Sequence, residues 1–175
     1  MILKLKRTPG IYLVGFMGCG KSTVGPALAD HLGWSFVDLD QEIETREGTT
    51  ITSLFETRGE PEFRRIESEL LRDRVKTISQ GRPNVVALGG GAFQSEANID
   101  LVMQHGVPIW LDCPFDRLER RVAQETHRPL ARDPERFRSL YESRRDVYSR
   151  AEYRIEVDSD DPHAAVKKIL ALNLI

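Results

Sequence analysis

Residues 15–22, Gly-Phe-Met-Gly-Cys-Gly-Lys-Ser, lie between a short run of large apolar residues and a segment with the apolar spacing of a helix. They match every fixed position of the pattern in which a glycine-rich loop joins a buried strand to a helix N-terminus. Glycines let such a loop curl, so that its amide groups face a phosphate. We expect Lys21 to reach the β- and γ-phosphates of a nucleotide and the Ser22 hydroxyl to bind Mg²⁺. A loop of this kind restricts the chain to α/β folds.

The rest of the chain alternates between short β-rich runs and segments with helical spacing. Strands that alternate with helices form βαβ units, which predict a three-layer α/β fold with a parallel sheet covered on both faces. No repeat or linker divides the sequence, so we expect one domain over residues 1–175. The expected strands are 11–14, 34–38, 84–88, 107–111 and 153–157, and the expected helices are 21–31, 40–46, 51–56, one that starts after residue 61, 95–104, 115–124, 134–150 and 162–172.

Composition excludes several classes of protein. No apolar run approaches the roughly 20 residues of a membrane-spanning helix, and the first ten residues lack the apolar region of a secretory signal. The two cysteines, Cys19 and Cys113, are too few for a disulfide framework or a four-ligand zinc site. A net charge of −2 disfavours a general nucleic-acid binder. We therefore expect a cytoplasmic protein with no membrane or nucleic-acid partner.

Arginine outnumbers lysine by 19 to 6, and eleven of the arginines but no lysine lie within residues 117–154. An arginine side chain is a planar fork that grips phosphates and carboxylates, whereas lysine is a point charge. Seven Asp or Glu residues share the same stretch. Composition alone therefore favours the alternative that these arginines form a solvated helix face and do not bind a phosphate or carboxylate.

The acid that helps to hold Mg²⁺ is expected at the end of the second strand, because the third strand ends in glycines. Open α/β sheets bind ligands at the carboxyl ends of their strands, where Asp38 and Asp40 lie. If the strand extends that far, its alternation points both carboxylates the same way, one toward Mg²⁺ and one toward an acceptor hydroxyl. The alternative is that one of them caps the following helix. Asp112 also ends a strand, and there we expect a helix-start role.

Two further features leave alternatives open. The glycines at 89–91 indicate either a close backbone approach or positive φ, or a bare turn. On the helix that starts after residue 61, Arg64 or Arg65 can grip an anion, or both can be solvated. The sequence lacks the N-K-x-D stretch with which GTPases read guanine. A small kinase and a nucleotide-binding switch both remain open on these residues.

Taken together, these segments resemble the shikimate kinase family, in the family's order and spacing. The resemblance implies a small nucleotide kinase-like P-loop fold with sheet order 2-3-1-4-5. It also implies a monomer that transfers the γ-phosphoryl group of ATP to the 3-hydroxyl of shikimate. The matching segments are GFMGCGKSTVG (15–25), FVDLDQEIE (36–44), GEPEFRRIE (59–67), ALGGGA (87–92), RPL (128–130) and LYESRRDVY (140–148).

The resemblance also implies roles for individual residues. Asp38 is expected to join Ser22 around Mg²⁺, and Asp40 to bind the hydroxyls beside the attacking oxygen, either as a base or only as an orienting group. The nucleotide is expected to contact Gly18, Cys19, Gly20, Lys21, Ser22 and Thr23, with Arg121 near the adenine. The expected catalytic residues are Lys21, Asp40 and Arg128.

For the acceptor, the resemblance implies a substrate segment at about 38–67 and a mobile lid at about 122–136. Arg128 is expected to close with the lid over the phosphates. Arg64 and Arg144 are expected to grip the shikimate carboxylate, and Arg144 rather than Arg145 is chosen by its four-residue spacing to Tyr148. Gly89, Gly90 and Gly91 complete the expected substrate site, with Gly90 binding through its backbone.

Two other functions remain as alternatives. One is a different small-metabolite kinase, such as a gluconate kinase, for which the combination of Asp40, Arg64 and Gly90 has no evident reason. The other is a regulatory module that binds a nucleotide without transferring a group. A module of that kind needs no second substrate site.

Overall fold

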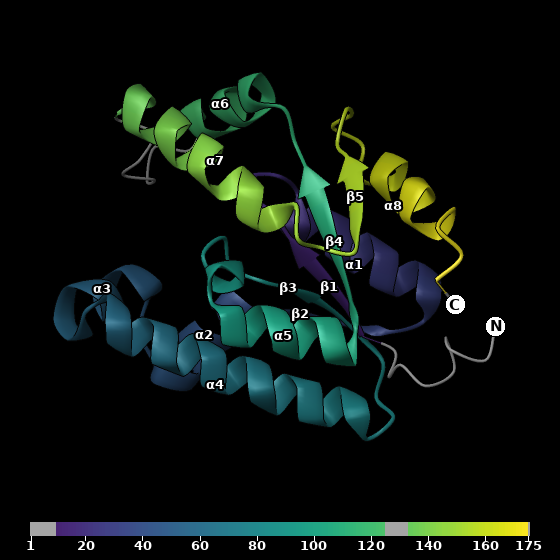
Figure 1. Ribbon diagram of the computed structural model, residues 1–175, viewed down its shortest axis with the longest axis horizontal. Coiled ribbons are helices and arrows are strands. Elements are labelled where there is room, and N and C mark those ends of the chain that lie inside the picture. The colour runs from purple at the N-terminus through teal and green to yellow at the C-terminus, as the bar shows by residue number, and fades with distance from the viewer. Residues whose placement is uncertain (1–9, 125–132, 175) are drawn as a thin grey trace.

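The computed structural model describes residues 10–124 and 133–174. Within them, one sheet of parallel strands has the order β2-β3-β1-β4-β5 (Figure 1), which confirms the order that the resemblance implied. Each strand lies within one residue of its predicted position at either end. The strands are β1 (Gly10–Val14), β2 (Ser35–Asp38), β3 (Asn84–Ala87), β4 (Val107–Asp112) and β5 (Tyr153–Glu156).

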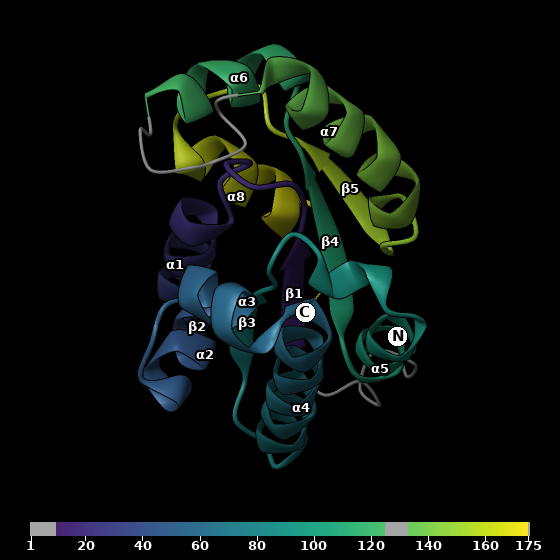
Figure 2. The ribbon, with the colours of Figure 1, turned by 90° about the vertical axis from the view of Figure 1, so that its left-hand side faces the viewer.

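Helices cover both faces of this sheet and complete three layers. The helices are α1 (Lys21–Leu32), α2 (Leu39–Glu47), α3 (Ile51–Arg58), α4 (Glu60–Ser79), α5 (Glu96–His105), α6 (Phe115–Ala123), α7 (Pro134–Tyr148) and α8 (Pro162–Leu170), with a 3₁₀ helix η2 (Ala92–Gln94). Figures 1 and 2 show α1 and α8 on one face, and α4, α5 and α7 on the other. None of the helices in the described ranges is long and apolar enough to cross a bilayer.

The central strands are apolar on both faces, as a sheet covered on both sides requires. Every residue of β1 and β3 is buried. Their register places Ile11 beside Val85 on one side and beside Val107 of β4 on the other. The sheet is therefore the centre of the core, and the carboxyl ends of its strands meet at one edge.

A second, smaller core holds α2, α3 and α4 together. Its buried residues are Ile43, Leu54, Phe63 and Ile66, and the partly buried Leu70 packs against both this cluster and the main core. The smaller core fixes the region expected to bind the acceptor against the edge of the sheet beside β2.

Asp112 differs from the sequence prediction. It does not start a helix, because the residue that precedes α6 is Pro114 and this helix has no side-chain cap among the described residues. Asp112 is instead the last residue of β4, is 5% exposed, and accepts hydrogen bonds from Arg145 and Arg154. Its partners lie more than 30 residues away in the sequence, so local spacing could not reveal this role.

Candidate functional site

The glycine-rich loop joins β1 to α1 at the carboxyl edge of the sheet. At Gly15, where φ is 151°, a Cβ would lie 2.8 Å from both the Leu111 carbonyl oxygen and Cys19 Sγ. Gly20 has left-handed backbone geometry and precedes the first residue of α1, and none of the described side chains caps this helix. Within this segment the Cys19 and Thr23 amides donate to the Phe16 and Gly20 carbonyl oxygens. An uncapped helix N-terminus that follows a glycine-rich loop is the kind of site that binds phosphates.

Lys21 lies across this loop. Its Nζ donates to the carbonyl oxygens of Gly15 at 2.5 Å and Phe16 at 3.1 Å, and Cys19 Sγ is 3.8 Å away. Ser22 and Thr23 follow in the first turn of α1, where Thr23 Oγ1 donates to the Gly20 carbonyl at 3.1 Å. The loop therefore presents an ammonium group and two hydroxyls beside its amides.

A cavity of about 880 Å³ begins at this loop and extends along the carboxyl edge of the sheet. It joins elements that are far apart in the sequence, so residues predicted separately come to one site. Its lining comes from the loop and the start of α1 (Met17, Gly18, Gly20, Lys21, Ser22, Thr23), the end of β2 and the start of α2 (Asp38, Asp40), the end of β3 and the glycines (Ala87, Leu88, Gly89, Gly90), α6 and its C-cap (Arg117, Arg120, Arg121, Gln124) and Asp160.

The α6 end of the cavity is basic. Arg121 Nη1 donates to the Gly18 carbonyl at 2.7 Å, and its Nη2 lies 3.3 Å from the Asp160 carboxylate. Arg117 donates to the same carboxylate at 2.8 Å and to the Asp158 carbonyl at 2.7 Å. Sequence reasoning selected Arg121 and missed Arg117 and Asp160. The four-residue spacing between the two arginines, which places them on one helix face, could have identified Arg117.

Asp38 is the last residue of β2 and the N-cap of α2. Its Oδ1 accepts hydrogen bonds from the Asp40 amide at 3.0 Å and the Gln41 amide at 3.3 Å. Asp38 thus caps α2 through Oδ1, as the alternative interpretation of the sequence predicted. The same side chain also lines the cavity. The strand does not extend to Asp40, so strand alternation is not what brings the two carboxylates together. The first turn of α2 does so instead.

Asp40 is a largely buried carboxylate in this cavity. Burial raises its pKa, the neighbouring Asp38 raises the pKa further, and Lys21 and Arg64 lower it. Its Oδ1 is inaccessible to solvent and has no hydrogen-bond partner among the described residues. A buried polar atom without a partner is costly unless a ligand supplies one. The arrangement therefore favours an acceptor atom aimed at a hydrogen-bond donor of a substrate.

Each of the three glycines after β3 lets one of the residues predicted to bind the acceptor substrate come close to the backbone. A Cβ at Gly89 would lie 2.6 Å from Asp40 Oδ1, and one at Gly90 would lie 3.2 Å from Arg144 Nη1. A Cβ at Gly91 would lie 2.7 Å from Arg64 Nη1. None of the three appears among the glycines with positive φ in the described chain. Space, rather than left-handed geometry or a bare turn, is the reason for glycine here.

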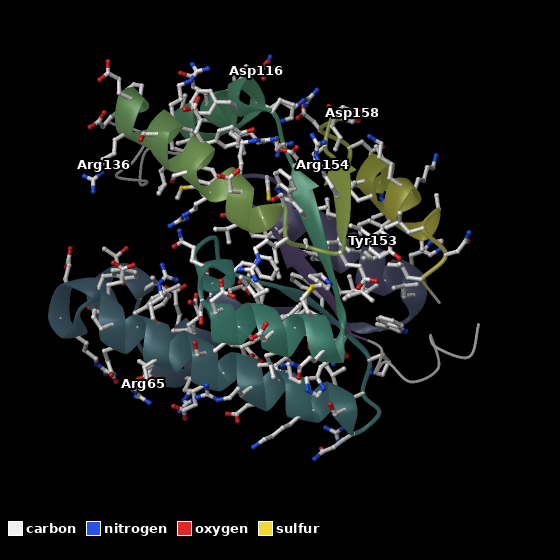
Figure 3. The ribbon with its side chains drawn as sticks, viewed as in Figure 1. Arg65, Asp116, Arg136, Tyr153, Arg154 and Asp158 are labelled. Carbon is white, nitrogen blue, oxygen red and sulfur yellow. The ribbon has the colours of Figure 1, made fainter. Side chains whose placement is uncertain are left out.

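Arg64 and Arg65 differ in their surroundings. Arg64 Nη1 donates to Glu67 at 2.9 Å, and its Nη2 lies 3.5 Å from Glu60. Arg65 pairs with exposed carboxylates on the outer side of α4, away from α7 (Figure 3). Glu67, which sequence reasoning did not assign, is 1% exposed, and burial raises its pKa. A charged residue three positions after Arg64 on the buried helix face is the signal that could have identified it.

Arg144 and Arg145 point to different places. Arg144 approaches Gly90, its guanidinium lies 5.9 Å from the Phe16 ring of the loop, and its buried Nε has no partner among the described residues. Tyr148, four residues on, donates from Oη to the Gly90 carbonyl at 2.6 Å. Arg145 instead binds Asp112. The side of α7 that faces the glycines thus carries Arg144, the residue selected from the spacing to Tyr148.

The predicted lid falls largely outside the described residues. Its ends are described, at the last turn of α6 and the first turn of α7. Arg128 lies in the part of the chain, residues 125–132, that the structure does not describe.

Comparison with known proteins identifies close relatives. A family model for shikimate kinase matches residues 17–173. A shikimate kinase of Sulfurihydrogenibium sp. is 40% identical over 161 residues, which cover 91% of this chain and 95% of that protein. A solved structure of a shikimate kinase from Acinetobacter baumannii in complex with shikimate has a TM-score of 0.85 and 38% identity, covering 95% of this chain and 93% of that one.

Kinases that act on other metabolites share the fold at lower similarity. The structure of a gluconokinase from Sinorhizobium meliloti has a TM-score of 0.57 and 21% identity, with 95% of this chain and 92% of that one covered. Similarity at this level shows a common fold and nothing about the acceptor.

Proposed function

The chain belongs to the shikimate kinase family, and from this premise we propose that it transfers the γ-phosphoryl group of ATP to the 3-hydroxyl of shikimate. The observation that carries the proposal is the cavity itself. At one end it has the glycine-rich loop with Lys21, and at the other it has Asp40, Gly89 and Gly90. Arg144 approaches Gly90, and Arg64 approaches the next residue, Gly91. Two anionic substrates, a nucleotide and a hydroxy acid, fit the charges at these two ends.

Arg64 and Arg144 are the proposed grip on the acceptor carboxylate. They reach the glycines from two different helices, α4 and α7, so a planar carboxylate can be held from two sides. Arginine forks match carboxylates in geometry as well as charge. The unpartnered Nε of Arg144 supports this role, because a bound carboxylate would supply the missing acceptor. Glu67 holds the Arg64 guanidinium in place.

The transfer step requires positioning and charge neutralisation more than covalent chemistry. We assign Lys21 to the phosphoryl oxygens and the Asp40 carboxylate to the 3-hydroxyl. As the hydroxyl oxygen bonds to the γ-phosphorus, the bond to the bridging oxygen of ATP breaks and ADP leaves. The hydroxyl proton passes to Asp40, whose burial favours the protonated form.

Ser22 and Asp38 are the proposed protein ligands of Mg²⁺. Mg²⁺ binds hard oxygen donors and uses one or two protein oxygens together with substrate phosphates. Both side chains line the cavity, and the Asp38 cap uses Oδ1, which leaves Oδ2 to bind a cation. When bound, the ion neutralises charge on the transferring phosphoryl group.

Several finer assignments belong to the same proposal. Residues 1–175 form one cytoplasmic, monomeric kinase domain without nucleic-acid partners, with the substrate segment at about 38–67. The lid at about 122–136 carries Arg128, which closes over the phosphates, and Arg121 lies near the adenine. Closure of a lid of this kind excludes water from the γ-phosphoryl group.

The test is acceptor-dependent formation of ADP. The chain is incubated with ATP, Mg²⁺ and, separately, shikimate, gluconate and other small hydroxy acids. We expect turnover with shikimate alone. Turnover with gluconate and none with shikimate would instead identify another metabolite kinase. ADP formation that no acceptor stimulates would favour a nucleotide-binding regulatory module.

A further inference from the structure

Asp112 is a buried carboxylate at the carboxyl end of β4 with two arginine partners. Arg145 on α7 binds it with both nitrogens, Nη1 to Oδ1 at 2.7 Å and Nη2 to Oδ2 at 3.1 Å. Arg154 on β5 binds Oδ2 through Nε at 2.8 Å and Nη2 at 2.6 Å. A two-point pair with a buried carboxylate fixes direction as well as distance. Asp112 therefore ties both α7 and β5 to the end of β4.

The guanidinium of Arg145 is held on its other sides as well. It lies 4.9 Å from the Trp110 ring centroid and 5.3 Å from that of Tyr141, and its Nη1 donates to Tyr141 Oη at 2.7 Å. Tyr141 Oη in turn donates to the Cys113 carbonyl at 3.0 Å. Aromatic stacking and these hydrogen bonds restrain the Arg145 guanidinium beside Asp112.

These contacts lie along one side of α7. Tyr141, Arg145 and Tyr148 follow the four- and three-residue steps of a helix face, and each is bound to backbone or carboxylate oxygens beside the sheet. Arg144 precedes Arg145 by one residue and lies about 100° away around the helix, as 3.6 residues per turn require. Any rotation of α7 that breaks the Arg145 contact must therefore move the Arg144 guanidinium relative to Gly90.

We propose that Arg145 is a positioning residue: its pair with Asp112 sets the rotation of α7, and through it the place of Arg144 at the acceptor carboxylate. The inference rests on the proposed function, since it takes Arg144 as a substrate ligand. Displacement of a binding group by about 1 Å can cost about a hundredfold in rate. Loss of the pair is thus expected to weaken acceptor binding, although Arg145 binds Asp112 of β4 and is not one of the proposed substrate ligands.

Arg154 provides a matched control. It binds the same carboxylate oxygen of Asp112 and also stacks on Trp110, at 5.4 Å. It lies on β5, which carries none of the proposed substrate ligands. A purely structural role for the Asp112 cluster predicts similar effects of removing either arginine, whereas a positioning role predicts an effect on the acceptor from Arg145 alone.

The experiment measures kcat and the KM values for shikimate and ATP, with thermal unfolding, in the wild type, Arg145→Ala, Arg145→Lys, Arg154→Ala, Arg144→Ala and the double variant Arg144→Ala/Arg145→Ala. We expect Arg145→Ala to raise the shikimate KM about tenfold or more and the ATP KM less than about twofold. Arg145→Lys, which keeps the charge, should recover part of the loss. Arg154→Ala should leave the shikimate KM within about twofold of the wild type.

The double variant decides whether Arg145 acts through Arg144. If it does, Arg145→Ala adds nothing to the shikimate KM once Arg144 is alanine, whereas independent roles multiply. Independent effects, an unchanged KM in Arg145→Ala, or an equal rise in Arg154→Ala would overturn the inference. Should Arg145→Ala not fold, Arg145→Lys with an unchanged shikimate KM would overturn it instead. If the wild type forms no ADP in response to shikimate, the proposed function itself is overturned. If the wild type is active and Arg145→Ala has the same shikimate KM, only the inference about Arg145 is overturned.

Discussion

At the scale of single residues, the site depends on how closely side chains approach the glycine backbone after β3. Asp40, Arg144 and Arg64 each lie against one of the three glycines, at a distance that a larger residue in place of the glycine would not allow. The glycines therefore shape the acceptor site without supplying any reactive group.

Gly91→Ala should specifically weaken acceptor binding. The new methyl group would lie 2.7 Å from Arg64 Nη1, too close for contact, so the guanidinium must move. We expect a rise of about tenfold in the shikimate KM and less than about twofold in the ATP KM. Gly33→Ala, which places a methyl group where no atom lies within 4 Å, is the control for a loss of stability alone. An unchanged shikimate KM in Gly91→Ala would contradict the proposed place of Arg64.

Asp40→Asn should remove turnover and yet stabilise the fold at neutral pH. Burial raises the pKa of Asp40, so the native state holds its proton more tightly than the unfolded chain does. Stability therefore falls as the pH rises from the ordinary carboxyl range through the raised pKa. At pH 7 the variant should therefore have a higher Tm than the wild type. The difference should narrow as the pH approaches about 4. A variant that melts lower at pH 7 would refute the argument.

At the scale of elements, α1 connects the phosphate loop to the sheet, and its packing depends on Gly25. Phe36 of β2 packs onto the helix at this glycine, where a Cβ would lie 2.9 Å from the ring atom Cδ2. The contact fixes the edge strand that leads to Asp38 and Asp40. The position of Asp38 and Asp40, the proposed metal ligand and the proposed substrate-binding carboxylate, is thus linked to the packing of a glycine of α1 against β2.

Gly25→Ala should destabilise the protein although alanine is the better helix former. The propensity gain is about 1 kcal/mol, whereas forcing a methyl group into a filled core costs typically about 1–3 kcal/mol. We expect a net loss of about 1 kcal/mol in the free energy of unfolding by urea. The second substitution Phe36→Leu, which removes ring atoms at the contact, should recover part of it. Stabilisation by Gly25→Ala alone would show that Phe36 is free to move.

The sequence predicts the elements well because their signals are local. The apolar runs of the strands, the loop motif and caps such as Thr50 and Ser95 are all readable over a few residues. Asp112 could not be predicted this way, since its role depends on arginines brought to it by the fold. Asp160 was missed for the same reason, because Arg121 approaches it from a distant part of the sequence. Glu67 differs, since its partner Arg64 is only three residues away and what the sequence does not show is its burial.

At the scale of the whole molecule, the arginine-rich stretch divides by position. Arg138 and Glu142 form an exposed pair of the solvated kind that composition favoured. Arg121 lines the cavity and Arg144 approaches its lining residue Gly90, whereas Arg145 and Arg154 bind a buried carboxylate. Composition could not identify Asp112 as the partner of this last pair, because the sheet brings them together, although the Arg154 side chain remains 57% exposed.

The cavity joins elements from most of the chain, so its ligands should stabilise the whole fold. A ligand at about 100 times its Kd adds about 2.7 kcal/mol to the stability, which corresponds to a rise of about 5–10 °C in Tm at this size. We expect ADP with Mg²⁺, and shikimate, each to raise Tm in the wild type. Lys21→Met should lose most of the nucleotide effect and keep the shikimate effect. If Lys21→Met lost the Tm rise with shikimate as well as the rise with ADP and Mg²⁺, the claim that the two ligands bind at separate ends of the cavity would be contradicted.

The position of the transferred phosphoryl group is the most direct test of the central claim, that one cavity brings ATP to the 3-hydroxyl of an acceptor held by its carboxylate. Wild-type chain, ATP, Mg²⁺ and shikimate are incubated, and the product is examined by phosphorus–proton correlation NMR. We predict one phosphate ester whose phosphorus couples to the proton on carbon 3, with one ADP formed per ester. Phosphate released only as the inorganic ion, or an ester at another hydroxyl, would contradict the account.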